Sequence, residues 1–303
     1  APILDKAIND NDGSLDEEDF IKARHYYGFG VPSIVGEGFC TLRGKAMTLK
    51  ERTATTHQGV ITGLFDDFFD KTNLRANQIK TMMHNPHDYI PTSSLEKLFI
   101  NSLIAIHENT TDIDGFNSTF DRVFEVQVDS LSQENESLSR DQLLDLTISK
   151  GGYSLLFYRS VFDNSMADGE ENAIFHVGGL MQLANDLFDV YDDSRDGINT
   201  LATTSRHVQQ LRSVYQERLI KTVEAVEQVD YPDKQVNRYI HKFLLGISRC
   251  PVCLDQLEDL EMRNGGIFDP LTFSRRNLVC DMEKWTNRFS SLKYYLKSRQ
   301  LSP

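Results

Sequence analysis

The stretch G-G-L-M-Q-L-A-N-D-L-F-D-V-Y-D-D, residues 178–193, decides how this 303-residue chain is interpreted. On a helix, Asn185, Asp189 and Asp193 recur every four residues and therefore share one face. Like charges on one face repel each other, and apolar residues such as Leu187 between them indicate that the strip is more than a solvated surface. We therefore expect a cation to bind there.

A second acidic cluster, L-F-D-D-F-F-D, spans residues 64–70. A helical pattern runs up to this cluster and predicts a helix that ends at about Asp70. Asp66, Asp67 and Asp70 would then crowd the C-terminal end of that helix, where the helix dipole disfavours negative charge. This cluster also predicts a bound cation.

The composition is that of a globular chain that can bury a large core, as one big domain or as two smaller ones, because 40% of its residues are apolar and 25% are charged. The net charge of -13 and the lack of a basic run argue against a nucleic-acid or an anionic-membrane surface. No apolar run approaches the roughly 20 residues of a membrane span, so no stable membrane insertion is expected. The sequence starts at Ala1 without a basic segment followed by an apolar one, and a cytoplasmic location is the expectation.

Apolar residues at helical spacing predict an all-α fold without strands. Capping-box pairs at Thr48 and Glu51, at Ser93 and Glu96, and at Ser139 and Gln142 mark three helix starts. The expected helices cover about 48–70, 93–107, 117–135, 139–162, 172–193, 205–229, 233–248 and 272–298, after a first helix that ends in a turn at Gly28, Gly30 and Pro32. Residues 36–45 are expected to form a loop. We predict one helical-bundle domain over residues 1–303, with about ten helices around a central cavity and an acidic segment at 1–15.

Two short motifs leave alternatives open. N-D-N-D-G-S-L-D-E-E-D-F near the start resembles a calcium loop, but Ile8 would occupy its first ligand position, so a capping box of Ser14 and Glu17 is favoured. C-P-V-C at Cys250 and Cys253 could be half of a zinc site or a redox pair. We favour a helix end broken by Pro251.

The two acidic clusters suggest a common chemistry if they face each other across the bundle. Carboxylate and amide oxygens favour Mg²⁺, which proteins commonly hold together with substrate phosphates. Bound Mg²⁺ would let an acidic protein take up a diphosphate and would promote its departure as a leaving group. Between the clusters, K-G-G at 150–152 interrupts a helical pattern, which indicates either a kink or a close approach by another segment. Aromatic residues near the motifs, including Phe65 and Phe157, could line the cavity or pack in the core.

D-D-F-F-D at 66–70 resembles the D-D-x-x-D motif of class I isoprenoid synthases. M-Q-L-A-N-D-L-F-D at 181–189 is similar to the second aspartate motif of trans-prenyl diphosphate synthases. Extended to Asp193, the same stretch resembles the N-S-E triad of terpene synthases, with aspartate in place of serine or threonine and of glutamate. T-I-S-K-G-G-Y at 147–153 resembles the diphosphate-contacting K-T segment of prenyl diphosphate synthases. The resemblance covers roughly residues 47–193.

This resemblance implies a class I terpenoid synthase fold, a prenyl diphosphate substrate and three Mg²⁺ ions, with Mn²⁺ as a substitute. The implied metal ligands are Asp66, Asp67, Asp70, Asn185, Asp186, Asp189 and Asp193, and Asp66, Asp70, Asn185, Asp189 and Asp193 are also the implied catalytic residues. The candidate diphosphate-binding residues are Lys150, Gly151, Arg75, Arg238 and Tyr239, with Arg24 and Arg43 as further basic candidates. A homodimer is a further expectation from the resemblance.

The branch of the family depends on basic residues around the first motif. Chain-elongating synthases carry paired arginines after it to hold a second diphosphate, whereas this chain has K-T-N-L-R-A-N at 71–77. We therefore favour a terpene synthase that cyclises or rearranges the carbocation of one prenyl diphosphate. A trans-prenyltransferase or a squalene/phytoene synthase-like enzyme is the alternative, and a non-catalytic helical binding protein is a third hypothesis.

Overall fold

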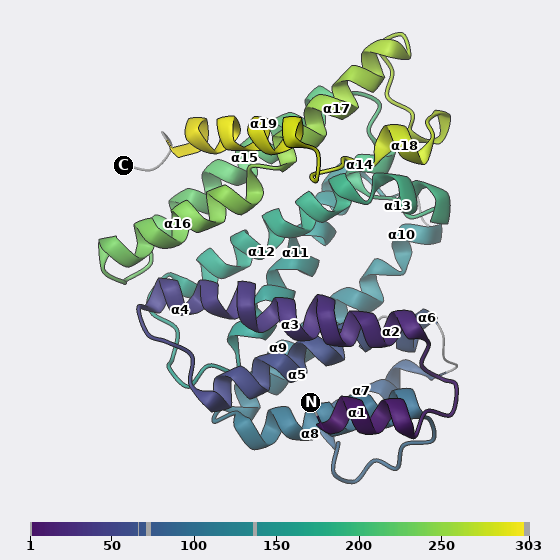
Figure 1. Cartoon of the computed structure of the whole chain (residues 1–303), viewed down its shortest axis with the longest axis vertical. Helices are drawn as coiled ribbons and strands as arrows, with labels where there is room; N and C mark the ends of the chain where they lie inside the picture. Colours follow the sequence, from purple (N-terminus) through teal and green to yellow (C-terminus); the bar gives the residue numbers. More distant parts are fainter. Residues whose placement is uncertain (1, 66, 71–73, 136–137, 300–303) are drawn as a thin grey trace. The chain divides into compact units, whose positions relative to one another are not determined.

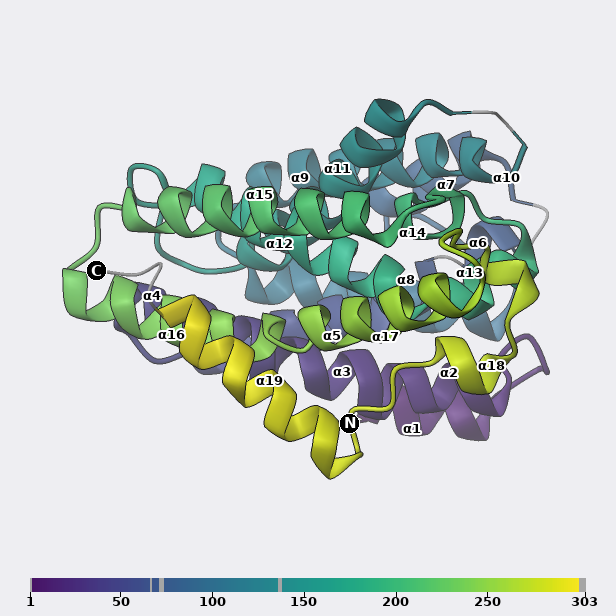
Figure 2. The same cartoon turned by 90° about the horizontal axis from the view of Figure 1, so that it is seen from above.

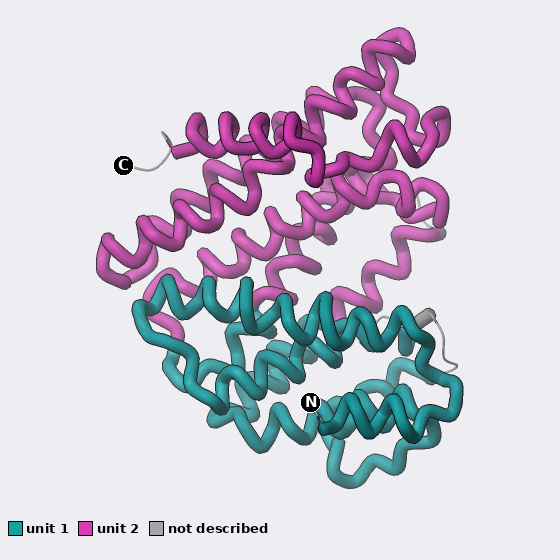
Figure 3. Tube along the Cα trace, in the orientation of Figure 1, with its two compact units in different colours: residues 1–124, 156–165 teal, residues 125–155, 166–303 magenta. Residues whose placement is uncertain are grey.

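The computed structural model describes residues 2–65, 67–70, 74–135 and 138–299, with Asp70 and Asn135 described without their side chains (Figure 1). Within these ranges the regular structure is entirely helical and contains no strand, which confirms the predicted all-α class. The chain divides into two compact units (Figure 3). Unit 1 comprises Ala1–Phe124 and Leu156–Ser165, and unit 2 comprises Glu125–Leu155 and Met166–Pro303. The single domain with a terpenoid synthase fold stays a prediction.

Unit 1 is built around the pairing of α5 with α8. Its helices are α1 (Pro2–Asn9), α2 (Glu17–Ile21), α3 (Tyr27–Gly30), α4 (Glu37–Arg43), α5 (Leu49–Phe65), α6 (Asp67–Asp70), α7 (Ala76–His84), α8 (Ser94–Asn109) and the first part of α9 (Ile113–Ser130). The helix predicted to begin at Asn117 therefore begins one turn earlier.

The predicted turn at Gly28, Gly30 and Pro32 is wrong, because the chain stays helical there. Two π-helical segments, Lys22–Tyr26 and Val31–Gly36, join α2, α3 and α4 into one path. A Cβ on Gly59 would collide with the Tyr27 carbonyl, so glycine is needed where α5 meets α3. The loop predicted for 36–45 is also wrong, since α4 occupies it and ends at Gly44, whose φ of 70° suits glycine.

The predicted capping boxes are confirmed at Thr48 and Ser139, and at Ser93 only the N-cap half forms. Ser93 accepts a hydrogen bond from the Glu96 amide at 3.2 Å, and the pairs at Thr48 and at Ser139 form in both directions. The box predicted at Ser14 and Glu17 is wrong. Asp16 and Asp19 form it instead, whereas the Ser14 hydroxyl accepts a hydrogen bond from the Leu95 amide at 3.0 Å.

A cluster of phenylalanine rings fills the middle of unit 1. Phe120 contacts Phe157 with ring centroids 4.9 Å apart and Phe65 at 5.4 Å, and Phe65 contacts Phe99 at 6.3 Å. Phe65, Phe99, Phe120 and Phe157 are each at most 5% exposed. The rings pack on each other in tilted and stacked arrangements, which favours the core-packing interpretation of Phe65 and Phe157.

Unit 2 holds the second acidic motif. Its helices are the end of α9, α10 (Ser132–Asn135), the main part of α11 (Arg140–Arg159), α12 (Glu170–Phe188), α13 (Val190–Asp196), α14 (Leu201–Thr204), α15 (Val208–Glu227), α16 (Asp233–Ile247), α17 (Cys250–Arg263), α18 (Arg275–Leu278) and α19 (Trp285–Ser298). The long α12 packs against α15 and α17. None of the helices in the described ranges combines the length and hydropathy of a transmembrane span.

The C-P-V-C segment lies where α16 ends and α17 begins. Pro251 stands in the first turn of α17, a position that tolerates proline, so the predicted helix break is confirmed. The helix itself, Cys250–Arg263, was not predicted. Cys250 and Cys253 are buried and are not joined by a disulfide, and Cys253 donates a hydrogen bond to the Leu187 carbonyl at 3.3 Å. The zinc and redox alternatives stay untested.

Candidate active site in unit 2

The first acidic motif lies in unit 1 and is only partly described. Asp66 falls outside the described residues, and so does the side chain of Asp70, whereas Asp67 is buried at 5% exposure. Within the region where a helix was predicted from Thr48 to about Asp70, the described residues are helical over Leu49–Phe65 (α5) and over Asp67–Asp70 (α6). The metal-binding roles predicted for Asp66, Asp67 and Asp70 stay predictions.

The second motif does not lie on one continuous helix, contrary to prediction. Helix α12 ends at Phe188, and Asp189, with φ -92° and ψ 7°, separates it from α13. The one-turn spacing nevertheless survives the break. The Asp189 amide donates to the Asn185 carbonyl at 2.9 Å, and the Asp193 amide donates to the Asp189 carbonyl at the same distance. Asn185, Asp189 and Asp193 therefore still follow one another along one face, as the sequence predicts.

The three motif side chains occupy different environments. Asn185 is exposed, whereas Asp189 and Asp193 are partly buried. The Asn185 Nδ2 atom donates a hydrogen bond to Asp189 Oδ2 at 2.6 Å. Burial raises the pKa of Asp189, and this hydrogen bond opposes the increase. The amide thus stabilises one carboxylate of the strip.

Asp186 faces inward and connects α12 to α11. Its Oδ2 atom accepts a hydrogen bond from Thr147 at 2.9 Å, and its Oδ1 atom accepts one from Gln182 at 2.9 Å. Asp186 is only 6% exposed, and burial raises its pKa although both hydrogen bonds lower it. Since both oxygens already bind side chains of the protein, Asp186 fits a positioning role, and its metal-binding role stays a prediction.

A pocket of about 130 Å³ lies beside the second motif, within unit 2. Its lining is polar for the most part and comprises Gln133, Leu146, Thr147, Lys150, Gln182, Asn185, Asp186, Asp193, Ile198 and Thr200. The structure thus brings Lys150 of α11 to the same pocket as Asn185 and Asp193, as the sequence predicts.

The negative charge in this pocket is only partly compensated. Burial, together with the nearby Asp186 and Asp189 carboxylates, raises the pKa of Asp193 to about 7, whereas Lys150 lowers it. A carboxyl group ordinarily loses its proton near pH 4. A cation that binds in the pocket would therefore stabilise the charged form of Asp193 at neutral pH.

Glycines allow α11 and α12 to pack closely together near the pocket. A Cβ on Gly178 would overlap the Gly151 carbonyl, and one on Gly152 would overlap the ring of Phe175. Helix α11 runs unbroken through K-G-G, so the close-approach interpretation is confirmed and the kink is wrong. The carbonyl of Gly151 lies against α12 at this crossing, and its predicted contact with diphosphate stays a prediction.

The other candidate diphosphate-binding residues lie elsewhere. Arg75, in unit 1, is the exposed N-cap residue of α7. Arg238 and Tyr239 lie on α16, and neither is among the residues that line the pocket. Arg238 is exposed, whereas Tyr239 is buried, and burial together with the charge of Glu170 raises its pKa. The predicted roles of Arg75, Arg238 and Tyr239 stay untested.

Several polar residues of the pocket were not predicted. Thr147 stands three residues before Lys150 on α11, and Gln182 stands four residues before Asp186 on α12. Such spacings place side chains on one helix face and could have identified both residues. Gln133 had no local signal, because its position depends on a distant partner: its side chain donates to the Asn199 carbonyl at 2.9 Å.

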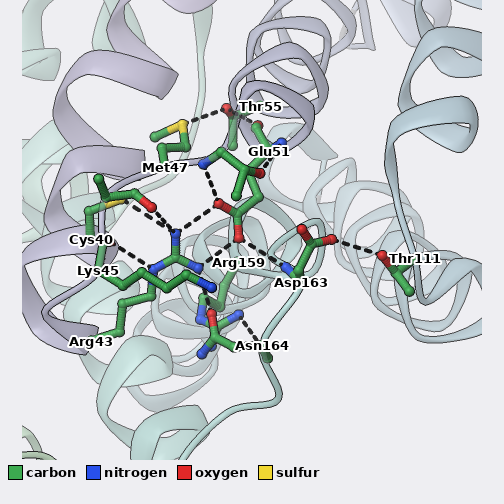
Figure 4. Close-up of polar contacts among 12 residues, drawn as sticks. Cys40, Arg43, Lys45, Met47, Glu51, Thr55, Thr111, Arg159, Asp163 and Asn164 are labelled. Carbon is green, nitrogen blue, oxygen red and sulfur yellow. Dashed lines mark hydrogen bonds and ion pairs between the residues drawn. The ribbon is translucent and has the colours of Figure 1, made fainter.

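Arg43, a basic candidate in the sequence, belongs to a buried network in unit 1 (Figure 4). Its guanidinium binds both carboxylate oxygens of Glu51, at 2.7 and 2.8 Å, and the two side chains are 2% and 0% exposed. Asn164 accepts a third hydrogen bond at 2.5 Å, and the Phe162 ring lies 4.7 Å from the guanidinium carbon. Arg43 is therefore a buried residue that stabilises the fold of unit 1.

Glu51 is stabilised in its charged form by this network. Burial by itself would raise its pKa, but Arg43 and the backbone amides of Thr48 and Asp163 outweigh burial and lower the pKa to about 2. The amides donate at 2.7 and 3.0 Å, respectively. Each oxygen of Glu51 thus has strong partners.

The fit of Mg²⁺ to the pocket can be judged from its donors. Asn185 and Asp193, which line the pocket, and the neighbouring Asp189 supply the hard oxygen atoms that Mg²⁺ prefers. Among the side chains that the structure describes, however, no three His, Cys, Asp or Glu groups converge into a ready metal-binding cluster. The set thus fits Mg²⁺ by donor type and by its unbalanced negative charge, but not by a convergence of three such groups among the described residues.

Comparisons of the chain with protein-family models, with curated proteins and with solved structures found no match. The chemistry of the pocket is therefore inferred from its own residues.

Proposed function

We propose that this chain is a Mg²⁺-dependent class I terpene synthase, which ionises a linear prenyl diphosphate and cyclises or rearranges the resulting carbocation. The observation that carries the proposal is the shared pocket of Lys150, Asn185 and Asp193. The carboxylates whose negative charge is not neutralised can bind metal ions, and the lysine beside them can bind an anion that those metal ions also hold. The resemblance of residues 66–70 and 178–193 to isoprenoid synthase motifs specifies that anion as a prenyl diphosphate.

The size of the pocket supports binding of a polar head group. Pockets that enclose a drug-sized ligand have volumes of roughly 300–1,000 Å³. The volume of about 130 Å³ is smaller, and its lining includes Thr147, Gln182 and Thr200. It is therefore suited to the diphosphate rather than to the whole prenyl chain.

Some residues at the pocket would bind the substrate or metal ions, and others position these binding residues. The Lys150 ammonium group binds a phosphate oxygen and offsets part of its charge. Asn185, Asp189 and Asp193 would hold Mg²⁺, which stabilises the departing diphosphate. Asp186 does not need to contact the substrate, because its hydrogen bond to Thr147 connects α12 to α11 and its hydrogen bond to Gln182 lies within α12. Lys150 is thereby held in the pocket that Asn185 also lines.

The proposal is tested by incubating the protein with Mg²⁺ and geranyl, farnesyl or geranylgeranyl diphosphate, with and without isopentenyl diphosphate. We expect diphosphate release and a hydrocarbon or terpene alcohol from a single substrate. A longer prenyl diphosphate, formed only with isopentenyl diphosphate, would identify a prenyltransferase instead. No diphosphate release with any substrate would contradict both activities and would favour a binding protein.

A matched pair of lysine variants links this activity to the pocket. Lys150→Met should reduce diphosphate release by about 10²-fold, because the ammonium group no longer stabilises the developing negative charge. Lys221→Met is the control: Lys221 lies in the same unit on α15, is exposed and pairs with Glu217 at 2.8 Å. Equal activities of the two variants would exclude Lys150 from the reaction.

A further inference from the structure

Helix α19, residues Trp285–Ser298, differs in charge from the rest of the chain. The chain has a net charge of -13, but the segment 284–299 contains no aspartate or glutamate. Its basic residues are Lys284, Arg288, Lys293, Lys297 and Arg299. All of these basic side chains are exposed. The helix is therefore a local basic surface on an acidic protein.

One face of α19 attaches it to unit 2. The Tyr294 hydroxyl donates to Asp255 of α17 at 2.8 Å, and Ser291 shares a hydrogen bond of 2.8 Å with Ser248. Helix α19 packs beside α16 and α17 and crosses them obliquely in Figure 2 (Figures 1 and 2). This polar attachment fixes which face of α19 points away from unit 2.

The opposite face of α19 carries a row of exposed apolar side chains. Trp285, Phe289, Leu292 and Leu296 are 71%, 60%, 46% and 52% exposed, respectively. They are separated by four, three and four residues, which places them on one stripe of a helix. The sequence pattern predicted a continuous helix over 272–298. The helix is in fact divided between α18 and α19, and the stripe on α19 faces outward rather than into the core.

Basic side chains border this stripe on both sides. With about 100° of rotation per residue, Arg288 and Arg299 fall on one flank, and Lys293 and Lys297 fall on the other. Long basic side chains in such positions can extend along an apolar surface while their charged ends stay in water. The outward face of α19 therefore consists of an aromatic and aliphatic stripe with cationic side chains along both of its edges.

We propose that α19 binds to the surface of an anionic lipid membrane, with its axis in the plane of the interface. Helices that combine Trp, Phe and Leu on one face with Lys and Arg beside it bury the apolar face at the boundary of headgroups and acyl chains. Anionic headgroups attract each nearby Lys or Arg. The helix adsorbs to one leaflet, which is consistent with the lack of a transmembrane span in the described helices.

The charge pattern favours a membrane over a second copy of the chain. In a symmetric dimer built on α19, the stripe of one helix would meet the same stripe of its partner. Lysines and arginines would then face lysines and arginines. The net charge of -13 argues against an anionic partner for the chain as a whole. Charges act mainly within a Debye length of about 10 Å, however, so the local charge of α19 determines what binds to it.

Trp285 makes the test direct, because it is the single tryptophan of the chain. The protein is mixed with vesicles of phosphatidylcholine containing 30% phosphatidylglycerol, or with vesicles of phosphatidylcholine alone, and both fluorescence and sedimentation are measured. With anionic vesicles we expect the Trp285 emission to shift to shorter wavelengths and the protein to sediment with the lipid. Neutral vesicles should give at least about tenfold weaker binding.

Variants with matched controls identify the surface. Reversing two charges, Lys293→Glu with Lys297→Glu, should weaken binding to anionic vesicles at least about tenfold. Leu292→Ser should also weaken it, whereas Ile220→Ser, at a similarly exposed site on α15, and Lys234→Glu on α16 should not. Circular dichroism establishes that each variant is folded.

Three outcomes would overturn the proposal. One is the absence of binding to anionic vesicles. Another is equal binding of wild type and of the Lys293→Glu, Lys297→Glu variant. The third is a wild-type protein that does not bind vesicles but forms a dimer in solution, which Leu292→Ser converts to monomer. A second copy of the chain would then be what covers the apolar stripe.

Discussion

Two groups of buried or partly buried charges in this chain have opposite character. In unit 1, Glu51 is bound by Arg43 and by two backbone amides, and its pKa falls to about 2. In unit 2, Asp193 lies near other carboxylates with Lys150 as a nearby cation, and its pKa rises to about 7. The charge of Glu51 is neutralised by Arg43, whereas the negative charge around Asp193 is only partly neutralised by Lys150.

The difference indicates what each group is for. A buried ion pair with complete hydrogen bonding contributes to the folded state, and breaking it leaves an uncompensated charge. Carboxylates that are held together against their mutual repulsion are expected where a ligand or metal supplies the missing charge. Removing a charge should therefore destabilise unit 1 and should inactivate the pocket of unit 2.

The largest expected effect is on stability, from Glu51→Gln. The substitution leaves Arg43 buried without its counter-ion and should lower the free energy of unfolding by about 3–5 kcal/mol. Urea denaturation followed by circular dichroism measures the change. Glu37→Gln is the control, since Glu37 and its partner Arg52 are 46% and 50% exposed and their pair should contribute less than about 1 kcal/mol.

The next effect is on catalysis, from Asn185→Ala. Loss of the amide removes a predicted metal ligand and the hydrogen bond to Asp189, so turnover should fall by about 10²–10³-fold. The midpoint of urea denaturation should change little, because Asn185 is exposed. Met181→Ala, one turn earlier on α12 and 40% exposed, should retain full activity. Unfolding of Asn185→Ala would instead mean that the motif is structural.

The stability difference between wild type and Glu51→Gln should depend on pH. The pKa of Glu51 is lower in the folded chain than the ordinary value of 4.5, so its contribution is fully present above about pH 4.5 and is lost as pH falls toward 2. We expect the difference in unfolding free energy to shrink by roughly 2–3 kcal/mol over that range. A constant difference would show that packing, and not charge, makes Glu51 important.

Two glycine substitutions test the helix crossing that supports the pocket. Gly178→Ala places a Cβ against the Gly151 carbonyl and should cost about 1–3 kcal/mol. Gly246→Ala on α16 meets no neighbouring atom within 4 Å and should stabilise the chain by up to about 1 kcal/mol, because alanine favours the helix. Thermal denaturation of both variants measures the contrast. Similar melting temperatures would contradict the close crossing.

The sequence predicted the helical class and much of the pocket because both depend on local spacing. Asn185, Asp189 and Asp193 follow one another at one-turn intervals, and Lys150 stands beside glycines that signal a close approach. The buried partners could not be predicted in this way. Arg43 and Glu51 meet Asn164 and Asp163 across more than 110 residues, and Gln133 meets Asn199 across 66.

The outward-facing stripe of α19 shows a second limit of local pattern. Apolar residues at helical spacing usually mark the face that is buried, and the residues of α19 satisfy that pattern. The face of α19 that packs against unit 2 is instead fixed by polar contacts, from Tyr294 to Asp255 and from Ser291 to Ser248. Hydrophobic periodicity does not predict such contacts.

The central claim is that the pocket of unit 2 binds diphosphate through Mg²⁺. Isothermal titration calorimetry with inorganic diphosphate, in the presence and absence of Mg²⁺, tests this claim most directly on wild type and Asn185→Ala. We predict binding to wild type with Mg²⁺, and at least about tenfold weaker binding without the metal or in the variant. Equal affinity under all these conditions, or no binding to wild type with Mg²⁺, would contradict it.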